Sequence, residues 1–184
     1  MSHALSYPSE SKGVSLLKDV LIVLGASLLI GLAARIVIPL PFTPVPIIFS
    51  VQAVIFFSVY LGKRGFLATL AYLAQGAMGA PVFAGGGSGI PYLLGPTGGY
   101  LVGFAVLSFT IALFSEQLKE KTPLKIFAIM LLGNALDYVF GVPHLALFVG
   151  AKKALMMGCY PFVVGDLFKL GIVFYTLRKL NYFR

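Results

Sequence analysis

The chain has 184 residues, of which 59% are hydrophobic and only 11% are charged. A soluble domain carries about 25% charged residues, so the composition excludes a polar coat over the whole surface and predicts that lipid covers much of it. The formal net charge of +8 could suggest nucleic acid, but the basic residues lie mostly between hydrophobic runs. This placement favours contact with lipid headgroups and a role in membrane orientation, with no nucleic-acid partner.

Six hydrophobic stretches predict an all-α membrane protein, because one transmembrane helix needs about 20 apolar residues. Residues 1–16 are polar and are expected to form a cytoplasmic tail, residues 17–180 the six-helix transmembrane domain, and residues 181–184 a second cytoplasmic tail. The single cysteine excludes an internal disulfide bond. The predicted spans are residues 17–38, 47–61, 66–80, 99–114, 126–142 and 161–180.

Two long connections contain no charged residue. Residues 39–46 include four prolines, which cannot continue a helix, and they predict an ordered loop. Residues 81–98 are rich in glycine and apolar residues and are expected to fold back onto the bundle. Residues 85–89 could suggest a phosphate-binding loop, but no Lys-Ser/Thr signature follows, so we expect the glycines to permit close backbone approach instead.

The distribution of basic residues predicts the orientation in the membrane. With six spans, both termini and the second and fourth connections share one side, and this side should be cytoplasmic because Lys and Arg are concentrated there. The two loops of the preceding paragraph then face outward. The basic residues on the cytoplasmic side are Lys12, Lys18, Lys63, Arg64, Lys119, Lys121, Lys125, Arg178, Lys179 and Arg184, against Arg35, Lys152 and Lys153 on the other.

Polar residues within the spans are candidates for function because they are costly in hydrocarbon. Each lies toward the outer end of its span, whereas the inner halves are almost entirely apolar. This asymmetry argues against a continuous pore, which needs polar groups at all depths, and predicts a cavity that is open outside and closed below. The residues concerned are Arg35, Gln52, Gln75, Tyr100, Asn134, Asp137, Asp166 and Lys169.

The last span carries the sharpest local feature. Asp166 and Lys169 are three residues apart and share one helix face, either as a neutralised ion pair or as an acceptor and a donor for a ligand. Asn134 and Asp137 share a face of the fifth span with Tyr138, for helix–helix hydrogen bonding or for a ligand. The sequence contains no catalytic constellation and no convincing metal site, so no enzyme is indicated.

The small residues Ser27 and Gly31 form a small-xxx-small step on the first span. Such a step permits close helix packing. The partner is either another membrane protein or a helix of the same bundle.

Four sequence motifs resemble those of the BioY family, the biotin-specific S components of energy-coupling factor (ECF) vitamin importers. They are PFTPVP at residues 41–46, PVFAGG at residues 81–86, GPTGGYL at residues 95–101 and PFVVGDLFK at residues 161–169. The resemblance extends over almost the whole chain, from the first span to the sixth.

This resemblance implies a six-helix bundle of the ECF S-component type in the plasma membrane of a prokaryote, which binds biotin in an outward-facing pocket. Its partners would be a transmembrane coupling protein and two cytoplasmic ATPases, with no cofactor of its own, and the first loop would act as a lid. Asp166 and Lys169 would bind the polar groups of biotin, with Asn134 as a second-rank ligand. The other expected substrate-binding residues are Tyr100, Gln75, Gly86 and Thr43.

Two alternatives remain open at this point. One is an S component for a different vitamin. The other is an intramembrane enzyme or a proton-coupled carrier that uses Asp137 and Asp166. The second alternative needs a polar path to the inner side, and the spans show none.

Overall fold

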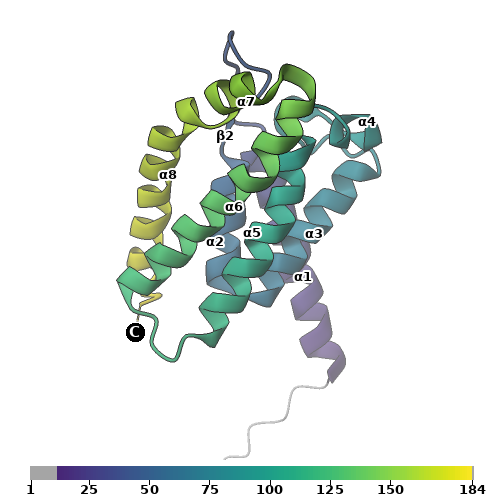
Figure 1. Ribbon diagram of the computed structural model, residues 1–184. Helices are drawn as coiled ribbons and strands as arrows, with labels where there is room; N and C mark the ends of the chain where they lie inside the picture. The colour runs from purple at the N-terminus through teal and green to yellow at the C-terminus, as the bar shows by residue number, and fades with distance from the viewer. Residues whose placement is uncertain (1–11, 184) are drawn as a thin grey trace, which may run out of the picture.

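The computed structural model describes residues 12–183, so the predicted tail residues 1–11 and Arg184 lie outside the described part of the chain. Six helices of 12 residues or more form one bundle (Figure 1), which confirms the predicted all-α, six-helix fold. They are α1 (Lys12–Ala33), α2 (Ser50–Leu61), α3 (Lys63–Ala77), α5 (Gly98–Gln117), α6 (Pro123–Val149) and α8 (Tyr160–Lys179). The shorter elements are β1 (Val37–Ile38), β2 (Ile47–Ile48), the 3₁₀ turn η1 (Ala84–Gly86), α4 (Gly89–Leu93) and α7 (Ala151–Gly158).

Helices α2 and α3 are too short to cross a bilayer alone. They have 12 and 15 residues, or about 18 and 22 Å at 1.5 Å per residue, against a hydrocarbon core of about 30 Å. Four segments are long and apolar enough to span: residues 13–33, α5, α6 and residues 151–179. Above α2 and α3, connecting segments complete the bundle, and Figure 1 shows α4 and α7 at this same end.

The first connection departs from the predicted boundaries. The first span was predicted to reach Ile38, but α1 ends at Ala33 and begins at Lys12 instead of Leu17. Residues 37–38 instead pair antiparallel with residues 47–48, with Val37 opposite Ile48. β-Branched residues favour strands, and the prolines between them force the chain to reverse direction.

The segment that follows the fifth predicted span is also more helical than expected. Helix α6 was predicted to end at Val142, but it continues through Pro143 to Val149. A proline removes one hydrogen bond and kinks a helix without always ending it. The next turn, at Gly150 with φ of 84°, leads into the short helix α7.

The inner half of the bundle satisfies its polar groups locally. Buried hydroxyl groups there donate to carbonyl oxygens of their own helix three or four residues back, as Ser58 does to Val54 and Thr69 does to Gly65. Ser108 and Ser115 make the same kind of bond within α5. These bonds leave hydroxyl groups unavailable to a ligand or an ion, in agreement with the predicted closed inner half.

The small-residue step on α1 faces the interior of its own bundle. Ser27 is fully buried and accepts a hydrogen bond from the Gln75 side chain of α3 over 3.0 Å. A Cβ atom at Gly31 would lie 3.3 Å from the Val82 side chain. Of the two interpretations of this step, packing within the bundle is therefore confirmed, and the lipid-facing side of α1 carries large aliphatic residues instead.

A glycine also sets the distance between α2 and α3. A Cβ atom at Gly65 would collide with the backbone of Phe57. Replacement Gly65→Ala should therefore lower the free energy of unfolding by about 1–3 kcal/mol through overpacking, measured as a lower thermal midpoint of the detergent-solubilised protein. Gly171→Ala is the matched control, because nothing lies within 4 Å of its Cβ position on α8. Equal midpoints for the two variants would contradict this account.

Candidate ligand site

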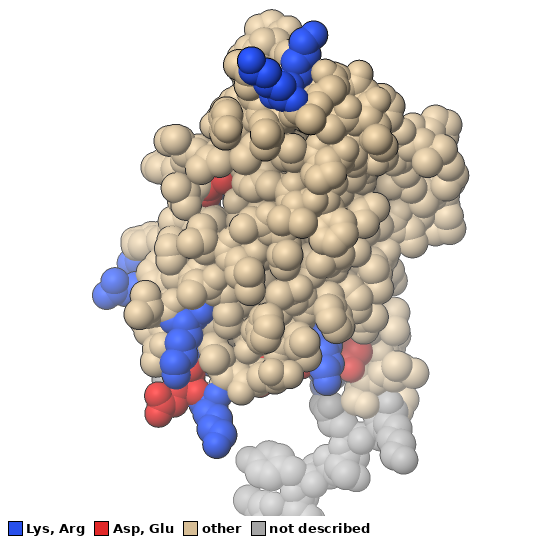
Figure 2. Space-filling model, viewed as in Figure 1, with Lys and Arg blue, Asp and Glu red and all other residues tan. Residues whose placement is uncertain are grey.

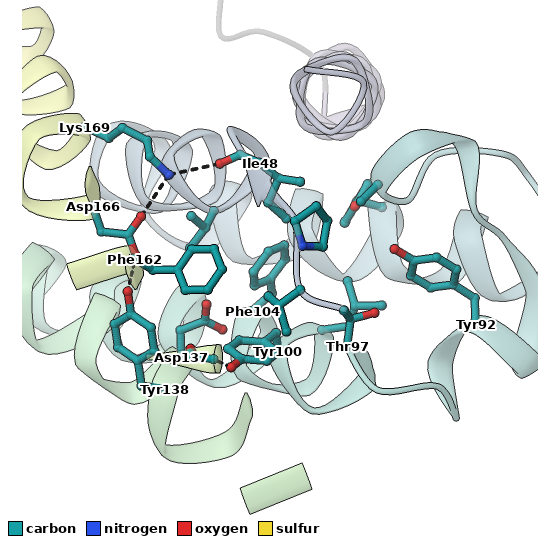
Figure 3. Close-up of a pocket in the computed structure, with 17 residues that line it drawn as sticks. Ile48, Tyr92, Thr97, Tyr100, Phe104, Asp137, Tyr138, Phe162, Asp166 and Lys169 are labelled. Atoms are coloured by element: carbon teal, nitrogen blue, oxygen red, sulfur yellow. Dashed lines mark hydrogen bonds and ion pairs between the residues drawn. The ribbon is translucent and has the colours of Figure 1, made fainter. Parts of the chain in front are cut away.

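Polar and apolar side chains at the end of the bundle that carries α4 and α7 surround a cavity (Figure 3). Its empty volume is about 620 Å³, which includes open solvent at the mouth. Helices α2 to α8 and the connections between them contribute to its wall, whereas α1 contributes no lining residue. The lining residues are Val45, Pro46, Ile48, Val51, Tyr72, Ala84, Tyr92, Thr97, Tyr100, Leu101, Phe104, Asp137, Tyr138, Gly158, Phe162, Asp166 and Lys169.

An ion pair forms the polar end of the cavity. Lys169 Nζ donates to Asp166 Oδ1 over 2.8 Å, and both side chains are 10% exposed. The same Nζ donates to the backbone oxygen of Ile48 in β2 over 3.2 Å. Asp166 also accepts hydrogen bonds from Gln52 Nε2 over 3.4 Å at Oδ1 and from the Tyr138 hydroxyl at Oδ2. The pair is therefore internally neutralised, as one interpretation of this motif expected, and it also lines the cavity. Its role as acceptor and donor for a ligand stays a prediction.

Aromatic rings form the opposite, apolar wall. Phe83 is fully buried and packs against Tyr72 of α3 with ring centroids 5.6 Å apart, and against Tyr92 of α4 at 5.2 Å. Arg35 donates to the Pro81 backbone oxygen over 2.6 Å and thereby holds the start of this loop on the end of α1. The loop of residues 81–98 thus folds onto the bundle, as expected from its lack of charge.

Tyr100 closes the cavity between α5 and α7. Its hydroxyl donates to the Gly158 oxygen over 2.7 Å. A Cβ atom at Gly141 would overlap the Tyr100 ring, so the absence of a side chain at Gly141 makes room for it. The ring is available to a ligand as an apolar surface, whereas its hydroxyl already has an acceptor.

Of the seven residues expected to bind substrate, the structure brings three together around the cavity. These are Asp166, Lys169 and Tyr100. The other four do not line it. Two are engaged elsewhere, since Thr43 donates to the Met157 oxygen over 2.8 Å and Gln75 donates to Ser27.

The remaining two expected residues lie outside the cavity wall for different reasons. Gly86 packs against the guanidinium group of Arg35. Asn134 is 6% exposed and lies one helical turn before Asp137, with its Oδ1 buried and without a partner. The depth of a residue along a span can be read from the sequence, but the rotation of each helix depends on its neighbours. For this reason the sequence could not show that Thr43, Gln75, Gly86 and Asn134 do not line the cavity.

Sequence reasoning gave too little weight to several residues of the site. Asp137 and Tyr138 line the cavity, and Gln52 donates to Asp166. The available signal was the shared face of Asp137 and Tyr138 with Asn134. Thr97 and Phe162 lie within the motifs at residues 95–101 and 161–169 but were not singled out, and no feature of the sequence marked Tyr92 or Phe104.

Removal of one partner from a buried ion pair destabilises a protein more than replacement of both partners by uncharged residues. Asp166→Asn alone or Lys169→Met alone should each lower the free energy of unfolding by about 3 kcal/mol or more. The double variant should recover much of this loss, because it leaves no uncompensated charge. Thermal unfolding of the ligand-free protein in detergent gives the comparison. A double variant that is less stable than both single variants would show that the charges act independently.

Comparisons with known proteins agree with this architecture. Residues 3–183 match the model of the BioY family. The probable biotin transporter BioY of Pyrococcus horikoshii is 38% identical over 75% of this chain and 82% of its own length. The biotin transporter BioY of Thermotoga maritima is 39% identical over 78% of this chain and 87% of its own length.

The fold also has a solved counterpart. The chain is similar to the crystal structure of the S-component for biotin from an ECF-type ABC transporter, with a TM-score of 0.84, 26% identity and 95% coverage of both chains. The relatives are named as transporters, in agreement with the expectation that this chain is not an enzyme. The chain is a multi-pass membrane protein and belongs to the BioY family.

Proposed function

We propose that this chain is the substrate-binding S component of an ECF-type importer and that it captures biotin from outside the cell. The observation that carries the proposal is the cavity, which joins an aromatic wall to a buried ammonium group in the outer half of a six-helix bundle. The names of its relatives and of its structural counterpart, all concerned with biotin, support the same ligand.

The chemistry of biotin fits these two surfaces. Biotin combines an apolar ring and chain with a ureido group and a carboxylate. An ammonium group has three N–H donors, and Lys169 uses two, for Asp166 and Ile48. The third can donate to the ureido oxygen, while Tyr72, Tyr92 and Phe104 pack against the ring. Such a site discriminates well, because an analogue without the polar group leaves buried donors unpaired.

The first loop is placed to act as a lid. Val45, Pro46 and Ile48 line the cavity, and the loop is fastened through Thr43 to α7 and through Ile48 to Lys169. Because Lys169 contacts both the lid and the site, a ligand that draws the ammonium group away from Ile48 weakens one fastening. Opening and occupancy are therefore coupled through a single side chain.

Delivery to the cytoplasm requires movement of the whole protein. The local hydroxyl bonds below the cavity leave no polar route through the inner half in residues 12–183. We propose that a transmembrane coupling protein and two cytoplasmic ATPases supply this movement in the plasma membrane. On the face in Figure 2, charged side chains gather mostly at the two ends, which leaves a largely uncharged band for lipid between them.

Purified protein should bind biotin with a measurable heat signal in isothermal titration calorimetry. Lys169→Met should weaken binding by about 2 kcal/mol, or roughly thirtyfold, because a charged hydrogen-bond donor is lost. Lys179→Met is the control, since this exposed lysine lies near the other end of α8. Riboflavin and thiamine should not compete. Absence of biotin binding by the wild type would refute the ligand, and normal binding by Lys169→Met would refute the site.

Labelling with a membrane-impermeant maleimide should establish the proposed orientation. In a Cys159→Ser background, Lys153→Cys on α7 should react in intact cells, because the end that carries the cavity faces outward. Lys63→Cys, at the start of α3, should react only after the cells are opened, since both termini and this turn lie in the cytoplasm. The reverse pattern of labelling would invert the topology.

A further inference from the structure

Two carboxyl groups line the cavity, and their surroundings differ sharply. Asp166 accepts hydrogen bonds from Lys169, Gln52 and Tyr138. Asp137 on α6 is only 7% exposed, yet its Oδ1 is buried without a partner. Within residues 12–183, no hydrogen bond or ion pair reaches Asp137.

Two tyrosine hydroxyl groups in the cavity wall already have acceptors other than Asp137. In the view of Figure 3, the Asp137 carboxyl group lies between the rings of Tyr100 and Tyr138. The Tyr100 hydroxyl donates to Gly158, and the Tyr138 hydroxyl donates to Asp166. On the α5 side, a Cβ atom at Gly103 would collide with the Asp137 side chain, so the glycine lets the two helices enclose the carboxyl group.

A buried carboxyl group without partners is strongly destabilising, so its presence in the wall of a ligand cavity calls for a donor that arrives with the ligand. Lys169 neutralises Asp166, whereas Asp137, which also lines the cavity, has an Oδ1 atom without a partner among the described residues. An N–H group of the ligand can donate to this oxygen.

We propose that Asp137 is a specificity-determining residue that accepts a hydrogen bond from a ureido N–H group of the ligand. This inference rests on the proposed function and refines it. The ureido end lies at Asp137 and Lys169, and the ligand carboxylate points away, toward Tyr92 and Thr97 near the loops. Asp166, which accepts from Lys169, Gln52 and Tyr138, holds Lys169 and Tyr138 in place beside this contact.

The test compares Asp137→Leu with Asn134→Leu. Both positions lie on the same face of α6, are buried to a similar degree and carry an unpartnered oxygen, but only Asp137 lines the cavity. Each replacement removes an unsatisfied buried group, so each should raise the thermal midpoint of the ligand-free protein. Asp137→Leu should weaken biotin binding at least about tenfold in calorimetry, whereas Asn134→Leu should leave it within about twofold.

A modified ligand tests the same contact from the other side. A biotin analogue with a methyl group on one ureido nitrogen should bind the wild type at least about tenfold more weakly than biotin, for one of the two nitrogens. In Asp137→Leu this difference should shrink, because the two changes remove the same contact. Asp137→Ala, which also removes both carboxyl oxygens, serves if the leucine variant does not fold, and it too should lose affinity.

The outcomes separate the inference from the function on which it rests. No binding of biotin by the wild type refutes the proposed function. Normal wild-type binding with unchanged affinity in Asp137→Leu or Asp137→Ala overturns the role of Asp137 and leaves the function intact. Equal losses in the Asp137 and Asn134 variants, or an undiminished penalty for the methylated analogue in Asp137→Leu, also overturn it.

Discussion

The buried pair of Asp166 and Lys169 is the interaction on which the site depends. A carboxylate and an ammonium group persist in an apolar interior only when both are paired and hydrogen-bonded. Here the additional partners come from β2, α2 and α6. The two buried charges of α8 therefore hold the first loop, α2 and α6 together around the ion pair. A cavity with a defined polar end follows from this requirement.

The space for the cavity comes from helices that are shorter than the membrane is thick. Because α2 and α3 have 12 and 15 residues, irregular segments must complete the outer half of the bundle. Non-helical backbone at this depth is tolerated where it is buried in protein or lines a cavity. The loop around Phe83 and the β1–β2 connection meet this condition, and together with α4 they form the apolar wall and the roof.

The protein retains a polar group that its own fold does not satisfy. Asp166 accepts hydrogen bonds from three side chains, whereas the buried Oδ1 atom of Asp137 has no partner within residues 12–183. Local departures from good packing and pairing are expected at functional sites, where stability is given up for ligand recognition. The contrast divides the two carboxyl groups into one that organises the site and one that awaits a ligand. The inner half shows the opposite pattern, because its hydroxyl groups are satisfied within their own helices.

The sequence by itself determined the fold class, the six helices, the apolar inner half and the shared helix face of Asp166 and Lys169, because hydropathy and helical spacing are local properties. It also carried the motifs of the family. Only the tertiary structure decided which polar residues meet. Gln75 and Thr43 lie at suitable depths but turn toward Ser27 and Met157, while Tyr92 and Phe162 enter the wall. The strand at Val37 likewise depends on a partner ten or more residues away. The depth of a residue in its span follows from its position along the chain. The rotation of each helix and the partners of its side chains follow from packing against segments that are distant in the sequence.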